Sequence, residues 1–150
     1  MKKKIVLLLG GLLLCISVLA GISIASDNSA KHPSDYHIGI PYSQAVNSQK
    51  PMLAVFYADW CSYCLKFMPR FYTLSKLYGD KYNFVMVNTE GSQSEIKLTK
   101  NMRISGLPTV YIIDPKYDNQ VLIPPSAYQD LFMFRKELDR FLRIRSLLDK

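Results

Sequence analysis

The stretch that decides the fold runs from Pro51 to Pro69 and reads PMLAVFYADWCSYCLKFMP. Residues 51–58 form a short, continuous apolar run, which is typical of a strand buried on both faces. From Cys61 to about Tyr78, apolar residues recur at helical spacing instead. The sequence therefore predicts a buried strand followed at once by a helix, with Cys61 and Cys64 at the junction.

These two cysteines stand at the C-x-x-C spacing, one helical turn apart. The start of a helix presents unpaired amide donors and a partial positive charge, which favour a thiolate. A thiolate is the nucleophile in disulfide exchange. We therefore expect Cys61 to attack a disulfide, and the more buried Cys64 to resolve the mixed disulfide that results. The third cysteine, Cys15, lies in an N-terminal apolar run. We expect it to serve there as a small apolar residue without redox function.

The rest of the chain predicts further strands and helices around this junction. Ser92 with Glu95, and Ser126 with Gln129, form capping-box patterns that open two of the helices. Strands separated by helices imply parallel neighbours with right-handed crossovers, whereas the last two strands, joined by a short turn, must be antiparallel. We expect an α/β fold, a mixed central sheet of about four strands with helices on both faces. Further strands are predicted at 83–87, 108–114 and 121–123, and helices at 41–48, 92–102 and 126–148.

Several independent features resemble the thioredoxin superfamily, over about residues 40–148. The resemblance implies a thioredoxin fold and the activity of an exported, bacterial-type thiol-disulfide oxidoreductase. No cofactor is expected. The features are the apolar strand, Trp60 before Cys61, the C-x-x-C pair, Pro69 five residues after Cys64, and Gly106-Leu107-Pro108-Thr109 further along the chain.

The resemblance also implies a substrate groove. Pro108 would form a cis peptide bond and face the dithiol, and the backbone just before it would pair with the substrate chain. Leu107 and Thr109 would flank the groove, and Trp60 would form its aromatic wall.

Two departures from thioredoxins concern the proton of the resolving cysteine. In thioredoxins a buried aspartate in the strand before the motif helps to deprotonate that cysteine, and the matching position here is Val55. The lysine that accompanies it is replaced by Met86. We therefore expect water or another group to take the proton from Cys64.

The direction of electron flow is indicated by the residues around the motif. The dipeptide Ser62-Tyr63 is not the Gly-Pro of thioredoxin and lacks the histidine of strong oxidants. A tyrosine before the second cysteine occurs in periplasmic isomerase-like members, but we find no extra dimerisation segment in this sequence. Leu107 is closer to the reducing thioredoxins. These features favour a reductase. An oxidase or isomerase with the same residues, and a non-catalytic binding module of an envelope assembly, stay open.

The first 26 residues predict export. Three lysines at 2–4 precede an uncharged run at 5–26, which fits a signal peptide or an uncleaved membrane anchor. Both place the rest of the chain in the periplasm or at the outer face of the cell membrane. We expect a linker at 27–39 and the thioredoxin-like domain at 40–150. The expected partners are cysteine-containing exported proteins and, for a tethered reductase, a membrane electron donor.

The formal net charge of +7 does not indicate nucleic acid, because no known binding motif accompanies it. The basic residues near the end of the chain share a predicted amphipathic helix with apolar ones. That pattern fits a solvated face, or contact with anionic lipid or an acidic partner. One cysteine pair and two distant histidines are too few for a zinc site of about four ligands.

Overall fold

The structure is a computed structural model that describes residues 30–150. The predicted signal peptide or anchor at 1–26 and Cys15 lie outside the described residues. Within the described part, no helix is both long and apolar enough to cross a membrane.

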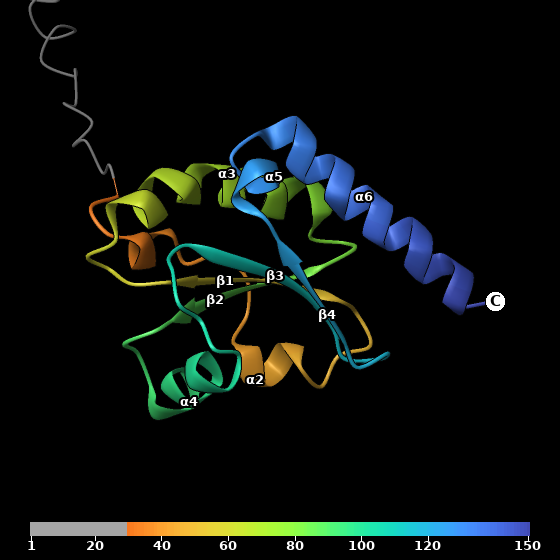
Figure 1. Ribbon diagram of the computed structural model, residues 1–150, viewed down its shortest axis with the longest axis horizontal. Coiled ribbons are helices and arrows are strands. Elements are labelled where there is room, and N and C mark those ends of the chain that lie inside the picture. The colour runs from red at the N-terminus through yellow and green to blue at the C-terminus, as the bar shows by residue number, and fades with distance from the viewer. Residues whose placement is uncertain (1–29) are drawn as a thin grey trace, which may run out of the picture.

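Four strands form one mixed sheet in the order β2-β1-β3-β4 (Figure 1). β1 pairs in parallel with β2, whereas the β1–β3 and β3–β4 pairs are antiparallel. The α/β class, the mixed sheet and the antiparallel final pair are confirmed. The strands are β1 (Met52–Tyr57), β2 (Asn83–Asn88), β3 (Thr109–Asp114) and β4 (Asn119–Ile123).

The prediction of parallel neighbours was wrong for β3, which pairs with β1 rather than β2 and runs against it. The reason lies in the lengths of the connecting helices. Helix α3 (Ser62–Tyr78) has 17 residues, about 25 Å, and carries the chain back along the whole sheet. Helix α4 (Gln93–Asn101) has 9 residues, about 13 Å, and stays at the end of the sheet where β2 finishes (Figure 1). The chain therefore enters β3 from that end.

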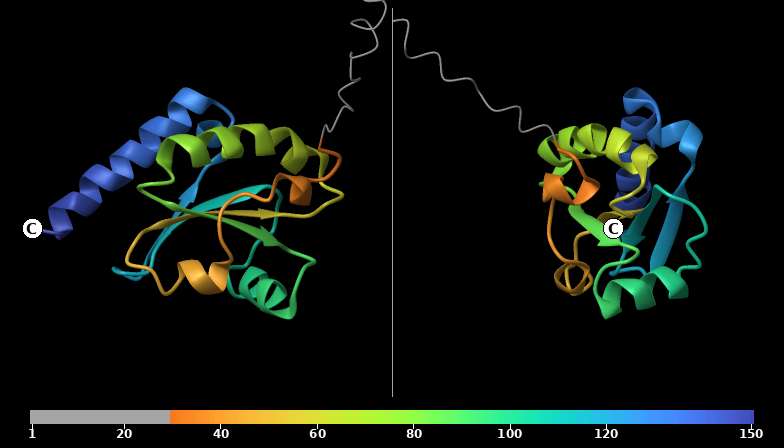
Figure 2. Two further views of the ribbon diagram at one scale, coloured as in Figure 1. Left: turned by 180° about the vertical axis from the view of Figure 1, so that it is seen from behind. Right: turned by 90° about the vertical axis from the view of Figure 1, so that its left-hand side faces the viewer.

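Helices cover both faces of the sheet (Figure 2). Because side chains alternate along a strand, Leu53 and Val55 face one core and Met52, Ala54 and Phe56 face the other. All of them are buried, which confirms that β1 is a strand packed on both faces. The first core is covered by η1 (Pro33–Tyr36), α3, α5 (Pro125–Tyr128) and α6 (Leu131–Leu148), and the second by α2 (Tyr42–Ala45) and α4.

The capping prediction holds for α4 but not for the last helix. Ser92 Oγ accepts a hydrogen bond from Glu95 N, and the Glu95 carboxylate accepts one from Ser92 N. At the C-terminal end, Ser126 lies inside the short α5 instead of opening the long helix. The long helix α6 begins after Asp130, whose Oδ1 accepts a hydrogen bond from Met133 N at 2.8 Å.

Packing against the sheet begins within residues 27–39, which were predicted to be a linker. Pro33 is buried, and Ile38 belongs to the core that faces α3. Gly39 has a φ of 81°, and a Cβ there would lie 1.9 Å from the carbonyl oxygen of Phe84. Glycine therefore allows this segment to approach β2, where Ile40 N donates a hydrogen bond to Phe84 O at 2.9 Å.

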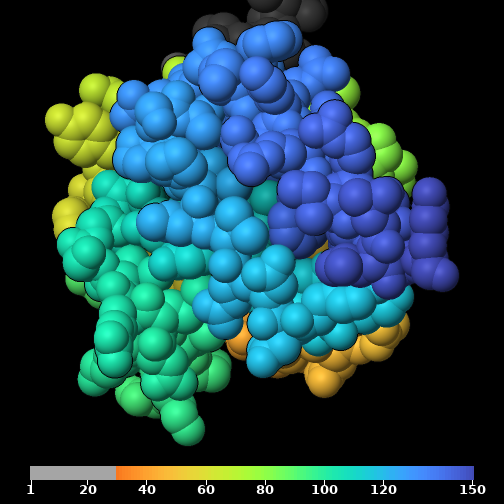
Figure 3. All heavy atoms as spheres, turned by 45° about the vertical axis from the view of Figure 1, so that its right-hand side comes forward, coloured from red at the N-terminus to blue at the C-terminus, as the bar shows by residue number. Residues whose placement is uncertain are grey.

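An ion pair between Asp114 and Arg145 lies at the end of the sheet where β3 finishes. Asp114 is 1% exposed and is the one buried charged residue in the described part of the chain. Arg145 Nε of α6 donates to its carboxylate at 2.6 Å, and Arg145 Nη2 donates to Gln49 O at 2.7 Å. Figure 3 shows α6, in dark blue, lying over this side of the molecule. Because β3 is antiparallel to β1, this end is opposite the one at which Cys61 follows β1.

Candidate active site

The sheet topology brings two loops together at one end. Phe56, near the end of β1, pairs with Thr109 at the start of β3. The loop that leaves β1 leads to Cys61, and the loop that enters β3 contains Leu107 and Pro108. Both loops therefore meet at the carboxyl end of β1, as the resemblance implied.

Cys61 and Cys64 form a disulfide with a Cα–Cα distance of 5.2 Å. Cys61 is the N-cap residue of α3, which confirms its predicted place at the start of the helix. Its Sγ accepts a hydrogen bond from Cys64 N at 3.1 Å. Cys61 is 5% exposed and Cys64 is 0% exposed. Cys61 therefore keeps a small exposed surface and lines a pocket, whereas Cys64 has no exposed surface.

Two exposed aromatic residues flank Cys61. Trp60 is 71% exposed and Tyr63 is 72% exposed. Trp60 Nε1 donates a hydrogen bond to Glu90 Oε1 at 2.9 Å, which fixes the orientation of the indole. Exposed aromatic surface beside Cys61 is suited to contact with a polypeptide.

The peptide bond between Leu107 and Pro108 is cis, as the resemblance implied. Pro108 O accepts a hydrogen bond from the Tyr128 hydroxyl at 3.0 Å, and Thr109 Oγ1 donates to Gly106 O at 2.6 Å. Burial raises the pKa of Tyr128, so its hydroxyl keeps its proton and remains a donor. Sequence reasoning missed Tyr128, because its contact with Pro108 spans 20 residues and leaves no local pattern.

One pocket is lined by Cys61 and a second lies next to it, and Tyr63 and Leu107 line both of them. The Trp60 pocket has a volume of about 480 Å³ and is lined by Trp60, Cys61, Ser62, Tyr63, Thr89, Thr99, Ile104, Ser105, Gly106 and Leu107. The Tyr128 pocket has a volume of about 630 Å³ and is lined by Tyr63, Lys66, Phe67, Arg70, Leu107, Pro108, Pro125, Tyr128 and Gln129.

The interior beneath the disulfide is apolar. Val55 is fully buried and belongs to the same core as both cysteines, and Met86 packs against that core. Within residues 30–150 the one buried carboxylate is that of Asp114, at the opposite end of the sheet. The two departures from thioredoxins therefore leave no buried acid beneath Cys64.

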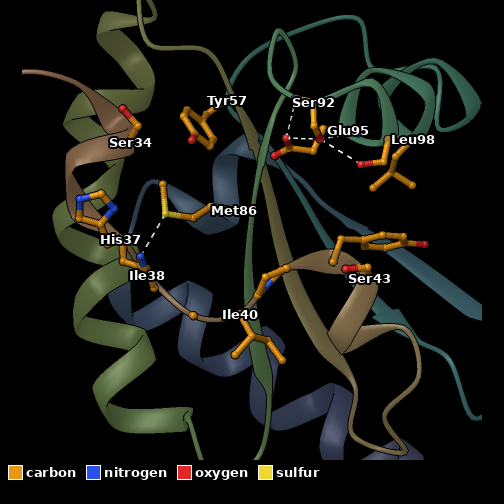
Figure 4. A pocket seen from close by; sticks show the side chains of 14 residues that line it. Ser34, His37, Ile38, Ile40, Ser43, Tyr57, Met86, Ser92, Glu95 and Leu98 are labelled. Carbon is orange, nitrogen blue, oxygen red and sulfur yellow. Dashed lines mark hydrogen bonds between the residues drawn. The ribbon is translucent and has the colours of Figure 1, made fainter.

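A third pocket, of about 520 Å³, lies between η1, α2 and α4 at the β2 edge and contains neither cysteine (Figure 4). Two of its lining side chains, Met86 and Glu95, accept hydrogen bonds from within the protein. Met86 Sδ accepts a hydrogen bond from Ile38 N, and the Glu95 carboxylate accepts from Ser92 and Asn88. Burial, and then the charges of Asp59 and Glu95, raise the pKa of Tyr57 to about 12. The Tyr57 hydroxyl therefore keeps its proton at neutral pH.

Across the described residues, no three histidine, cysteine or acidic side chains are grouped so that they could hold a metal ion.

The fold and the site together define a thioredoxin-fold protein with a C-x-x-C disulfide. A family model described as Thioredoxin matches residues 37–132. The chain therefore belongs to the thioredoxin family.

Its sequence relatives include thioredoxin-like and interchange proteins. The chain is 36% identical over 75 residues to the thioredoxin-like protein HCF164, chloroplastic, of Arabidopsis thaliana, a match that covers 50% of this chain and 28% of the relative. It is 33% identical over 91 residues to the thiol:disulfide interchange protein TxlA of Synechococcus elongatus, covering 61% and 47%. The matches thus span between about a quarter and a half of these relatives.

Solved structures show the fold alone, because their sequence identities are low. A thioredoxin from Trypanosoma brucei brucei has a TM-score of 0.57 at 13% identity, covering 81% of this chain and 99% of that one. The J-Trx1 fragment of ERdj5 has a TM-score of 0.58 at 18% identity, covering 68% and 46%.

Proposed function

We propose that this protein is an exported thiol-disulfide oxidoreductase that acts as a reductase on cysteines of other exported proteins. The observation that carries the proposal is the Cys61–Cys64 disulfide at the start of α3, with Cys61 more exposed than Cys64. The Trp60 pocket and the neighbouring Tyr128 pocket, which share Tyr63 and Leu107, give a substrate chain a place to lie.

The proposed reaction begins with both cysteines reduced. The Cys61 thiolate attacks one sulfur of a substrate disulfide, so that the substrate S–S bond breaks and one substrate thiolate leaves. The Cys64 thiol loses its proton, and its sulfur attacks the mixed disulfide on Cys61, which releases the second substrate thiolate. The substrate gains two electrons and, on protonation, two protons, and the protein ends with the Cys61–Cys64 disulfide of the structure. A dithiol donor then returns it to the reduced state.

Two features support the reducing direction. No histidine stands between the cysteines, and Leu107 before the cis proline is the apolar choice of reducing thioredoxins. The helix N-terminus at Cys61 favours the reactive thiolate in either direction of exchange.

The basic and apolar N-terminal sequence supports a place outside the cytoplasm, in the periplasm or on the outer face of the membrane. There, a reductase needs electrons from a membrane partner, because cytoplasmic reductants do not reach it.

The test is a trapping experiment with the full chain. In cells that produce Cys64→Ser, exported proteins should accumulate as mixed disulfides on Cys61, and the Cys61→Ala/Cys64→Ser double variant should trap none. Alkylation of the native chain in the same cells should find the pair mostly reduced. A mostly oxidised pair would identify an oxidase instead. Full biological activity of Cys61→Ala, together with the absence of adducts, would identify a non-catalytic binding module.

A further inference from the structure

The Tyr128 pocket lies next to the pocket that contains Cys61. It is formed between the first turns of α3 and the short α5, which lie side by side (Figure 1). Tyr63 and Leu107 line both this pocket and the Trp60 pocket, and Cys61 lines the latter. A polypeptide that reacts at Cys61 and lies along Leu107 therefore enters the Tyr128 pocket on one side of its cysteine.

The floor of this pocket is apolar and aromatic. Phe67 and Tyr128 are both buried, and their ring centroids lie 5.3 Å apart in an edge-to-face arrangement. The Tyr128 hydroxyl already donates to Pro108 O, so it is engaged within the protein. Such a floor accepts an apolar side chain and offers little to a polar one.

The rim of the pocket is basic. Lys66 and Arg70 are exposed and lie one turn apart on the same side of α3. Among the ion pairs between described residues, neither takes part in one, and the pocket lining contains no carboxylate. Asp130, which follows α5, is engaged as the cap of α6 through its bond with Met133 N.

A negatively charged residue, Glu90, lies beside the Trp60 pocket. There, Glu90 accepts the hydrogen bond of the Trp60 indole. The surface on either side of Cys61 is therefore polarised, with two cations at the Tyr128 pocket and a carboxylate near the Trp60 pocket.

We propose that the Tyr128 pocket selects substrates in which an apolar side chain and acidic residues stand beside the reacting cysteine. This inference rests on the proposed function and names the class of polypeptide that the site prefers. Lys66 and Arg70 are its specificity-determining residues. Because both cations are exposed, their contribution is modest and depends on salt concentration. We expect about a 3- to 10-fold preference at low salt that fades in high salt.

The preference can be measured with the reduced full chain in detergent and synthetic peptides. Each peptide carries one cysteine in a mixed disulfide with 5-thio-2-nitrobenzoate. Attack of Cys61 on the peptide sulfur breaks that bond and releases the coloured thiolate. One peptide has phenylalanine and two glutamates beside the cysteine, the second has lysines in place of the glutamates, and the third has glycine in place of phenylalanine. Each set is made with these residues on either side of the cysteine.

The native chain should favour the glutamate–phenylalanine peptide over the other two, on one side of the cysteine only. The Lys66→Glu/Arg70→Glu variant should reverse the preference between glutamate and lysine. Lys76→Glu, which reverses one charge at an exposed site in the last turn of α3, should leave that preference as it is. Equal rates for all three peptides, or a preference unchanged by the double reversal, would overturn the inference.

The reaction of each variant with free 5,5′-dithiobis(2-nitrobenzoate), which needs no groove, separates this inference from the proposed function. Loss of selectivity with that reaction intact counts against the pocket alone. Absence of that reaction in the native chain counts against the proposed function. Circular dichroism and thermal unfolding should confirm that both charge variants are folded.

Discussion

Replacing Val55 by aspartate should supply the base that the interior beneath the disulfide lacks. Val55 is fully buried in the same core as Cys61 and Cys64. In the native chain Cys64 must therefore give up its proton without help from a buried carboxylate. Its attack on a mixed disulfide should accelerate about tenfold per pH unit while the thiol is mostly protonated, because the rate follows the thiolate fraction.

The cost of the substitution follows from the burial of Val55. Removing a fully buried valine side chain costs about 1.5–3 kcal/mol, and a buried carboxyl group without a partner costs about 1–3 kcal/mol more. Ordinary domains have about 5–15 kcal/mol of stability, so we expect Val55→Asp to fold with a lower unfolding midpoint. Burial should raise the pKa of the new aspartate by several units above about 3.9, into the range of a general base near neutral pH. Such a base accelerates proton transfer by about 10²–10⁴-fold.

The measurement is a single-turnover experiment. A fluorescent peptide is placed on Cys61 as a mixed disulfide, and its release by Cys64 is followed by stopped flow from pH 5 to 9. Val55→Asp should release the peptide about a hundredfold faster than Val55→Asn at pH 7, with a new inflection near neutrality. The asparagine variant is the matched control, because it is as large and as polar but is not a base. Identical profiles for the two variants, or a carboxylate inflection already present in the native chain, would refute the reasoning.

Two further predictions concern stability. Arg145→Met should lower the free energy of unfolding by about 3–5 kcal/mol, because it leaves the buried Asp114 carboxylate without its ion-pair partner. The Asp114→Asn/Arg145→Met double variant should recover most of that loss. Urea unfolding measures both changes. Equal urea midpoints for Arg145→Met and the native chain would contradict this account. For Tyr57, whose pKa is raised to about 12, stability is fully present below the unfolded value of about 10 and is lost as the pH rises from there toward 12. Tyr57→Phe should remove part of that alkaline loss, measured as unfolding free energy between pH 9 and 12, and an unchanged pH dependence would show that Tyr57 does not cause it.

The sequence could predict the parts of the site that depend on patterns of neighbouring residues. The apolar run of β1 and the helical spacing of α3 place Cys61 at the start of a helix, and this inference does not depend on the rest of the fold. The cis bond at Pro108 was predicted from the resemblance, because the motif around it is itself local.

The parts that it could not predict depend on where the chain goes in space. The direction of β3 depends on the end of the sheet at which α4 finishes. The spacing of apolar residues does not indicate that position. The start of α6 was misplaced because Ser126 and Asp130 both fit an N-cap, and helix propensity does not choose between them. The hydrogen bond from the Tyr128 hydroxyl to Pro108 O joins two segments that lie 20 residues apart in the sequence, and no local pattern indicates it.

The contact between η1 and the loop before Cys61 sets a limit on proteolytic processing. Ser34 N donates a hydrogen bond to Asp59 Oδ1 at 3.1 Å, two residues before the reactive cysteine, and Ile38 lies in the core beside α3. Removal of residues 1–26 leaves this contact whole. A cut between residues 34 and 40 removes it, and with it one of the supports of the loop that presents Cys61. A shortened recombinant domain should therefore begin before Pro33, not at the boundary near residue 40 that composition alone suggests.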